Sequence, residues 1–339
     1  MIAVIALVAA LGAIPPQNPA PAEPPAPAVS PGLDLQVRLD RAGFSPGEID
    51  GKPGSNTRKA LAAFQRDAGL PVSGRPDTAT LAALAAAAPG DTVVAYQVTA
   101  GDVEGPFIGS VPDDMMEKAG LPALGYTSAL ELMSERFHAS PALIESLNPG
   151  LALAAGATVQ VPNVRPRPDP PAPAAGAKGG AQAGTGAAAD KAAAGKAAGA
   201  TAPGVTVTVS KSERSLTVTG EDGRVLLYAP VTVGSVNDPL PIGDWKVTGV
   251  HRDPVFHYNP DLFWDADPAH AKAKIPPGPN NPVGVVWIDL TRPHYGLHGT
   301  PEPSTIGRTE SHGCVRLTNW DALHVAALVA PGTPVLFRP

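Results

Sequence analysis

The stretch HGTPEPSTIGRTESHGCVRL, residues 298–317, gathers two histidines, the only cysteine of the chain and Arg316. A cysteine that attacks a carbonyl does so as the thiolate, so an imidazole must take its proton and a third group must hold that imidazole in the productive tautomer. Glycine beside the cysteine lets the backbone approach a substrate closely, and the arginine is a forked donor for a carboxylate. This combination is typical of nucleophilic acyl chemistry.

The same residue types also permit a metal site, because two histidines four residues apart and an H-x-C are permissible zinc spacings. The candidate ligands would be His294, His298, His312 and Cys314. However, Gly296 and Gly299 break the helix that would place the first two of these histidines on one face. Acyl chemistry is therefore favoured over zinc binding, and no metal or cofactor is expected.

Outward from this stretch, the chain from residue 204 to its end has the period-two alternation of β-strands. Strands are expected at 205–210, 215–219, 225–233, 243–250 and 285–290. A helix is expected over 319–329, with Asn319 as its N-cap. The aromatic residues between 256 and 264 are expected to pack a long loop or to line a substrate site. The pattern predicts a mostly β, mostly antiparallel domain over 204–339.

Three short segments of this domain match one family pattern. They are residues 295–300 (YGLHGT), 306–307 (IG) and 311–317 (SHGCVRL). Together, and with the interval between the first histidine and the cysteine, they resemble the signature of the L,D-transpeptidase catalytic domain. The likeness extends over about residues 204–337. Residues 234–243 resemble a segment that usually reads T-P-x-G in that family, from which Leu240 and Ile242 depart.

The resemblance implies a role for each residue of the motif. Cys314 would be the nucleophile, His298 its general base, and the Gly299 carbonyl the acceptor that orients the imidazole. His312 and Gly313 would shape the loop and, with the Cys314 N–H, form an oxyanion hole. The candidate substrate-binding residues are Arg316, Ser311 and Tyr295. Spacing alone leaves open which histidine takes the proton, although a neighbour two residues from the cysteine often points across the loop, which favours His298.

By the same resemblance, the expected function is that of an exported peptidoglycan L,D-transpeptidase. Cys314 would attack the carbonyl at the L-centre of diaminopimelate in a tetrapeptide stem and release the terminal D-alanine. An amine from a second stem, or a lipoprotein lysine, would then resolve the thioacyl-enzyme. Two alternatives stay open: an L,D-carboxypeptidase or endopeptidase that uses water with the same residues, and a non-catalytic wall-binding scaffold.

Residues 33–88 show apolar spacings that suit three short helices. Ser55 and Asn56 are expected to cap the second helix, and Asp77 to cap the third. The GF…IDG turn, the TRKALAAFQ helix and the L-x-x-x-G…D-x-x-T helix start resemble a three-helix peptidoglycan-binding domain. The segment is therefore expected to be a small all-α domain that binds glycan strands, or a helical bundle without a ligand.

Residues 94–162 are expected to form an α+β module. A strand at 96–98, helices at 128–138 and 141–147, and a closing strand at 159–161 fit the pattern. From residue 130 to 162 the sequence resembles the second half of a lysin motif, a glycan-binding βααβ module. About 25 residues separate the first strand from the first helix, where the family has a short turn. Glycan binding and a spacer role both stay open for this module.

Proline and glycine supply 41 and 36 of the 339 residues, about 23%, against roughly 12% in ordinary usage. This composition predicts small domains on proline-rich tethers. The expected linking segments are a secretory signal at 1–14, a Pro/Ala spacer at 15–32 and a disordered Pro/Ala/Gly tether at 163–203. Export to the periplasm or cell envelope would leave a protein without stable membrane insertion. The net charge of −6 disfavours a nucleic-acid partner, and a single cysteine excludes an intramolecular disulfide.

Overall fold

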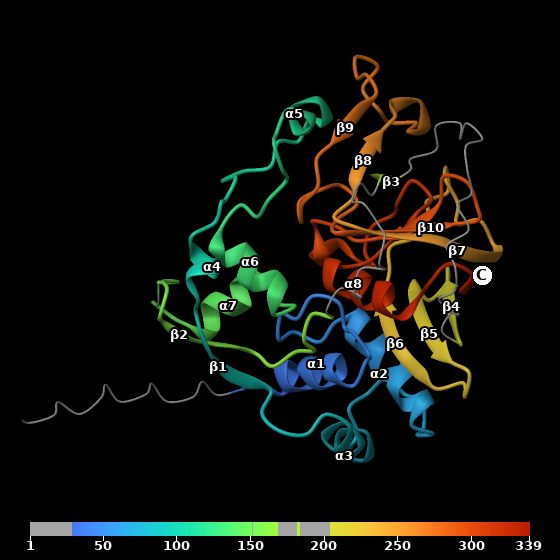
Figure 1. The fold of residues 1–339 in the computed structure, drawn as a ribbon. Helices are drawn as coiled ribbons and strands as arrows, with labels where there is room; N and C mark the ends of the chain where they lie inside the picture. The colour runs from blue at the N-terminus through green and yellow to red at the C-terminus, as the bar shows by residue number, and fades with distance from the viewer. Residues whose placement is uncertain (1–28, 151, 169–181, 184–203) are drawn as a thin grey trace, which may run out of the picture.

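The computed structural model describes residues 29–150, 152–168, 182–183 and 204–339. The secretory segment expected at 1–14, and most of the spacer and tether, lie outside these ranges. Within the described ranges, no helix is both long enough and apolar enough to cross a membrane. In Figure 1 the C-terminal β domain lies on the right, the green middle module on the left, and the blue N-terminal helices along the bottom.

The C-terminal domain is built on an eight-stranded sheet. In spatial order its strands are β12 (Val315–Arg316), β11 (Gly296–His298), β10 (Val286–Leu290), β7 (Gly243–Arg252), β13 (Pro334–Arg338), β4 (Val205–Ser210), β5 (Ser215–Gly220) and β6 (Val225–Pro230). Neighbouring strands are antiparallel except in the pairs β11/β12 and β13/β4. The valines of β4 are buried and its alternate residues are not, so the expected mostly antiparallel β domain is confirmed.

Helix α8 (Asn319–Leu328) packs against β10 and β11. Its N-cap is Thr318, whose Oγ1 accepts a hydrogen bond from the Asp321 N–H at 3.2 Å. The prediction that Asn319 caps this helix was wrong. Threonine and asparagine are both favoured cap residues, and the cap is the threonine one position earlier. The Asn319 side chain instead contacts the loop before β10, where its Nδ2 donates to the Pro279 carbonyl oxygen at 3.1 Å.

Three helices form the N-terminal domain, as expected: α1 (Pro31–Arg41), α2 (Ser55–Asp67) and α3 (Thr78–Ala87). Asp77 caps α3 through its side chain, as predicted. The N-cap of α2 is Gly54, however, and not Ser55 or Asn56. Asn56 Nδ2 donates instead to the Ile306 carbonyl oxygen at 2.9 Å. A contact with the β domain therefore occupies a side chain that local sequence suggested as a cap.

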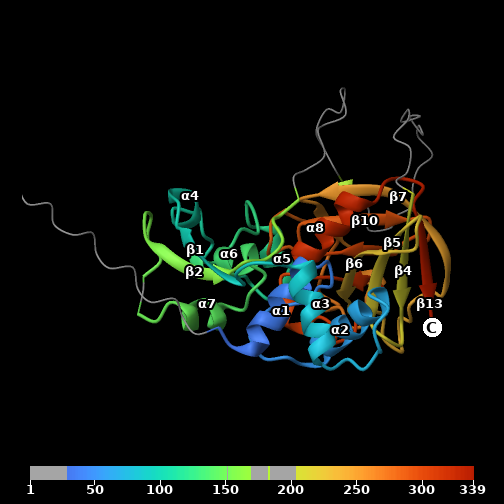
Figure 2. The same ribbon diagram turned by 90° about the horizontal axis from the view of Figure 1, so that it is seen from below.

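The N-terminal domain lies against β6, the last strand of the sheet (Figure 2). The loop after α1 runs alongside this strand: the Tyr228 N–H donates to the Gly43 carbonyl oxygen at 2.8 Å, and the Tyr228 carbonyl oxygen accepts from the Ser45 N–H at 2.9 Å. Tyr228 is buried in one core with Phe44 and Phe64. Composition predicted domains held apart by tethers, but these described residues share a core.

The middle module pairs its first and last strands. Its elements are β1 (Val93–Gln97), α4 (Ala100–Val103), α5 (Met115–Ala119), α6 (Ala129–Arg136), α7 (Pro141–Leu147) and β2 (Thr158–Pro162). β1 and β2 are antiparallel, with Tyr96 opposite Val159. The segment between β1 and α6 leaves this unit, and α5 lies beside β9 (Ala273–Ile275) of the β domain (Figure 1). The βααβ order therefore contains an insertion that reaches another domain.

The prediction that residues from 163 onward form a disordered tether was wrong at its beginning. The Arg165 side chain is only 13% exposed, and its Nη2 lies 3.1 Å from Asp40 Oδ1 and 3.3 Å from Asp321 Oδ1. Farther along, β3 (Gln182–Ala183) pairs in parallel with β8 (Val255–Tyr258). Composition missed the first contact because it counts apolar side chains, whereas opposite charges hold Arg165 in place.

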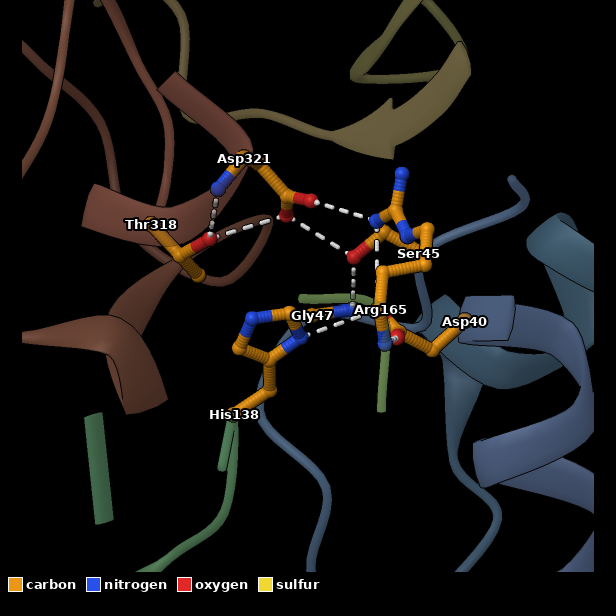
Figure 3. Close-up of polar contacts among 7 residues, drawn as sticks. All are labelled: Asp40, Ser45, Gly47, His138, Arg165, Thr318 and Asp321. Atoms are coloured by element: carbon orange, nitrogen blue, oxygen red, sulfur yellow. Dashed lines mark hydrogen bonds and ion pairs between the residues drawn. The ribbon is translucent and has the colours of Figure 1, made fainter. Parts of the chain in front are cut away.

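Arg165 lies in a buried polar cluster that joins the N-terminal helices, the middle module and the β domain (Figure 3). His138 Nδ1 lies 3.1 Å from Asp40 Oδ1, and Ser45 Oγ donates to Asp321 Oδ2 at 2.8 Å. Burial acts to raise the pKa of Asp40, but the charges of Arg165 and His138 outweigh it and hold that pKa well below its usual range. Burial raises the pKa of Asp321. The three units are thus joined through carboxylates shielded from water.

Candidate active site

Two neighbouring strands bring the predicted nucleophile and base into one region. β11 ends at His298, Cys314 directly precedes β12, and the strands pair in parallel with His298 opposite Arg316. Gly313, the residue before the cysteine, has a φ of 102°, a left-handed conformation that favours glycine. A Cβ at this position would also lie 2.7 Å from Cε1 of Tyr295. Both the backbone and the available space therefore require glycine at this turn.

These residues open onto a cavity of about 530 Å³. Six of the eight predicted site residues line it: Tyr295, His298, Ser311, His312, Cys314 and Arg316. The other two, Gly299 and Gly313, contribute backbone next to the cavity-lining histidine and cysteine. Ser311 Oγ donates to the Cys314 carbonyl oxygen at 2.6 Å, and this bond fixes the turn that carries the thiol.

The His298 ring is buried and held on two sides. Its Nδ1 lies 2.7 Å from the Gly299 carbonyl oxygen, and its face stacks on Trp287 with the ring centroids 5.3 Å apart. Because a carbonyl oxygen only accepts, Nδ1 carries the proton and Nε2 is left as an acceptor. Burial, with the nearby Arg316 charge, lowers the pKa of His298 to about 3. The imidazole is therefore neutral at pH 7 and able to take a proton.

The Cys314 thiol is also neutral in the resting site. Burial raises its pKa to about 11, although the Gly296 backbone and the Arg316 charge act in the opposite direction. Its Sγ lies 3.6 Å from the His294 carbonyl oxygen. A neutral thiol and a neutral imidazole line the same cavity, so a thiolate at Cys314 would form only when another group takes the thiol proton.

The second candidate base, His312, is directed toward a different group. Its Nε2 lies 2.8 Å from Asp265 Oδ1, and its ring meets Phe263 edge-on with the centroids 5.1 Å apart. A carboxylate accepts, so this nitrogen donates to Asp265. No local pattern connects His312 with Asp265, which lies 47 residues earlier in the chain.

Arg316 brings a positive charge into the cavity. In the part of the chain that the structure describes, its buried Nε has no hydrogen-bond partner. Burial lowers the pKa of Arg316, and the nearby Cys314, Glu302 and Asp265 counteract that effect. An arginine remains charged at neutral pH even so. The cavity wall therefore carries a positive charge close to the cysteine.

Comparison with protein families identifies two regions of the chain. The model of the L,D-transpeptidase catalytic domain matches residues 204–336, and that of the "Putative peptidoglycan binding domain" matches residues 33–84. Residues 204–336 belong to the L,D-transpeptidase catalytic domain family. The transpeptidase domain also contains every residue proposed above for the cysteine site.

Individual relatives resemble this chain over the transpeptidase domain. "Putative L,D-transpeptidase YkuD" of Bacillus licheniformis is 32% identical over 133 residues, 39% of this chain and 65% of that protein. "Probable L,D-transpeptidase YbiS" of Escherichia coli K12 is 28% identical over 137 residues, 39% of this chain and 44% of that protein. The chain thus spans less than two thirds of the length of these relatives. Among solved structures, an L,D-transpeptidase from Mycobacterium smegmatis aligns with 41% of this chain and 59% of its own, at 22% identity and a TM-score of 0.33.

One wall of the transpeptidase cavity comes from segments that the sequence did not connect with the site. The wall includes Met115 of α5 and residues of the loop between β8 and β9. His270 joins the two segments, since its Nε2 lies 2.7 Å from Asp114 Oδ2 and its Nδ1 lies 3.0 Å from the Tyr258 hydroxyl. Of the two expectations for the aromatic residues at 256–264, lining the site fits Phe256, Tyr258 and Phe263. The insertion in the middle module was the only feature of the sequence that singled out the segment with Met115, and it did not indicate that this segment lines the cavity.

The zinc interpretation does not fit the geometry of the transpeptidase domain. Among the residues that the structure describes, no three His, Cys, Asp or Glu side chains gather in a way that could hold a metal ion. Nδ1 of His298 is bonded to a backbone carbonyl and Nε2 of His312 to Asp265. The four side chains with zinc-like spacing are therefore not assembled into a ligand set.

We expect the rate of Cys314 alkylation by iodoacetamide to rise from about pH 6 to about pH 10 without a plateau near neutrality. Burial raises the pKa of the thiol to about 11 and lowers that of His298 to about 3, so the thiolate fraction grows only as the pH approaches the thiol pKa. Because the chain has one cysteine, intact mass spectrometry measures labelling at a single site. A rate that levels off between about pH 5 and pH 8 would show a preformed thiolate–imidazolium pair instead.

Proposed function

We propose that this chain is an exported peptidoglycan L,D-transpeptidase with Cys314 as its nucleophile and His298 as its general base. The observation that carries the proposal is the shared cavity lined by a cysteine, an arginine and a histidine whose Nδ1 is held by a backbone carbonyl. The family of the domain supports the reaction class. The domain matched at residues 33–84 supports peptidoglycan as the partner.

In the first half-reaction, His298 Nε2 takes the thiol proton as Cys314 Sγ attacks the carbonyl at the L-centre of diaminopimelate in a tetrapeptide stem. The Cys314 N–H, with the turn at Gly313, stabilises the resulting oxyanion. When the tetrahedral intermediate collapses, the bond to the terminal D-alanine breaks and His298 returns the proton to the leaving amine. A thioester between the stem and Cys314 remains.

In the second half-reaction, an amine attacks the thioester carbonyl. His298 takes a proton from this amine, the new amide bond forms as the C–S bond breaks, and the departing thiolate receives the proton from His298. The energy of the original peptide bond is kept in the thioester, so the transfer needs no ATP. The acceptor is an amine of a second stem, or of a lipoprotein lysine.

Of the other site residues, Arg316 binds the substrate, and Ser311, Tyr295 and His312 position the loop that carries the thiol. The Arg316 guanidinium lines the cavity and suits a stem carboxylate, because a guanidinium pairs with carboxylates in a forked geometry. Ser311 and Tyr295 hold the turn at Gly313, the first through its bond to the Cys314 carbonyl oxygen and the second by filling the space beside the glycine. His312, held by Asp265, shapes the loop that leads into Gly313 and the cysteine.

The decisive test incubates the purified chain with a disaccharide tetrapeptide and analyses the products by mass spectrometry. We expect a cross-linked dimer together with free D-alanine. A monomeric tripeptide without any dimer would show that water is the acceptor and would make the chain an L,D-carboxypeptidase. No turnover, combined with retention on isolated sacculi, would leave only a wall-binding scaffold.

A further inference from the structure

Asn319 lies between the middle module and the backbone that holds His298. Its side chain is buried, and its carboxamide uses all of its hydrogen-bonding groups: Oδ1 accepts from the Val285 N–H at 3.1 Å, and Nδ2 donates to Glu135 Oε2 at 3.0 Å and to the Pro279 carbonyl oxygen at 3.1 Å. A carboxamide whose oxygen and two N–H donors are all engaged has one orientation.

This carboxamide touches the glycine that orients the imidazole. A Cβ on Gly299 would lie 2.2 Å from Asn319 Oδ1, and one on Gly284 would lie 2.0 Å from the same atom. The side chain therefore packs directly on the backbone of both glycines. The Gly299 carbonyl oxygen is the atom 2.7 Å from His298 Nδ1. The position of the Asn319 carboxamide consequently helps to set the position of that carbonyl.

The carboxylate that holds Asn319 comes from another part of the protein. Glu135 belongs to α6 of the middle module, 184 residues away from Asn319 in the chain. Its second oxygen accepts from the Tyr126 hydroxyl at 3.3 Å. One turn earlier on the same helix, Glu131 Oε1 accepts from Asn280 Nδ2 at 2.8 Å. Two carboxylates of α6 thus reach the β domain, but only Glu135 contacts Asn319.

We propose that Glu135 is a positioning residue for catalysis, which holds the Asn319 carboxamide so that the Gly299 carbonyl keeps His298 in the tautomer with the proton on Nδ1. The inference rests on the proposed function, because it assumes that His298 is the base. Orientation of a catalytic imidazole by a third group is a general requirement of this chemistry, and such groups depend on their own supporting hydrogen bonds. The middle module is in this way a part of the catalytic structure.

The kinetic test compares Glu135→Ala with Glu131→Ala, a matched loss of a carboxylate from the same helix. We expect Glu135→Ala to lower kcat for D-alanine release by roughly 10- to 100-fold with little change in KM, because a small displacement at a distance misplaces the base. Glu131→Ala is expected to stay within about 3-fold of wild type. Glu135→Gln retains an acceptor oxygen and should recover most of the rate. Equal losses in the two alanine variants would show a docking role only and overturn the proposal.

A second measurement needs no peptidoglycan. The His298 Nδ1 proton, identified by its absence in His298→Gln, should give a slowly exchanging downfield signal in the proton NMR spectrum. We expect Glu135→Ala to lose this protection and Glu131→Ala to keep it. Should Glu135→Ala fail to fold, Glu135→Asp withdraws the carboxylate by one methylene and provides the same comparison.

The two measurements separate the inference from the function on which it rests. Unchanged kcat and an unchanged proton signal in Glu135→Ala would overturn the positioning role and leave the transpeptidase proposal standing. A different outcome is that Glu135→Ala loses the protected proton while the wild-type chain turns over no muropeptide. That outcome would support the positioning contact and contradict the proposed activity.

Discussion

A Cys314→Ala variant will release no D-alanine from a disaccharide tetrapeptide and will form no cross-linked dimer. Cys314→Ser, which keeps a small polar side chain in the same space, is expected to lose roughly 10³-fold or more of the activity, because a hydroxyl is a much weaker nucleophile in a site built for a thiol. The thiol lies at the cavity with His298 and Arg316. Mass spectrometry of the muropeptide products measures both effects.

The same variants give a second result with a carbapenem. We expect a covalent adduct on the wild-type chain and none on Cys314→Ala, because Cys314 Sγ would open the strained β-lactam ring of the carbapenem. Intact mass is decisive here, since the chain contains one cysteine. Melting temperatures of the variants provide the control for folding. D-alanine release by a folded Cys314→Ala variant would contradict the proposed mechanism.

Replacing Arg165 by methionine is expected to destabilise the protein by about 3–5 kcal/mol, because it leaves buried carboxylates without their compensating charge. Asp40 and Asp321 are both 0% exposed, and each lies within hydrogen-bond reach of the guanidinium. Arg167→Met is the matched control, since Arg167 is exposed, and its effect should stay within about 0.5 kcal/mol. Urea denaturation followed by circular dichroism measures the difference.

The effect of Arg165→Met should depend on pH in a defined direction. Asp40 has a folded pKa below its ordinary value of 3.8, so its ion pair stabilises the protein at pH values above the ordinary pKa and loses this contribution as the pH falls through the folded pKa. The destabilisation is therefore expected in full near neutrality and to shrink below about pH 4. Equal urea midpoints for wild type and Arg165→Met at pH 7 would contradict the role given to the cluster.

Features that depend on local pattern were predictable from the sequence. The buried valines of β4 alternate with polar residues, so the strand and its inner face follow from a period of two. The helices of the N-terminal domain follow from apolar spacing and from caps such as Asp77. Cys314 and His298 stand in short motifs whose glycines and neighbours mark the chemistry. Each of these signals lies within a few residues of the feature that it predicts.

Features that depend on distant partners were not predictable in this way. Thr318 and Asn319 are both favoured caps, and the choice between them was decided by contacts of Asn319 with the preceding loop and with Glu135. Arg165 lies in a segment whose composition indicates disorder, yet Asp40 and Asp321 hold it. Met115 reaches the cavity only because an insertion crosses from another module. No local periodicity records such contacts.

The pairing of the loop after α1 with β6 has a practical consequence for dividing the protein. β6 is an outer strand of the eight-stranded sheet, and the Tyr228 backbone is satisfied by Gly43 and Ser45. Removing the N-terminal helices would leave those groups unpaired beside Leu226, a side chain that is already 44% exposed. An uncovered strand edge is a template for pairing with another chain. A shortened protein that begins at β4 is therefore expected to self-associate. In the full chain, the N-terminal helices keep the β domain soluble by covering this strand edge.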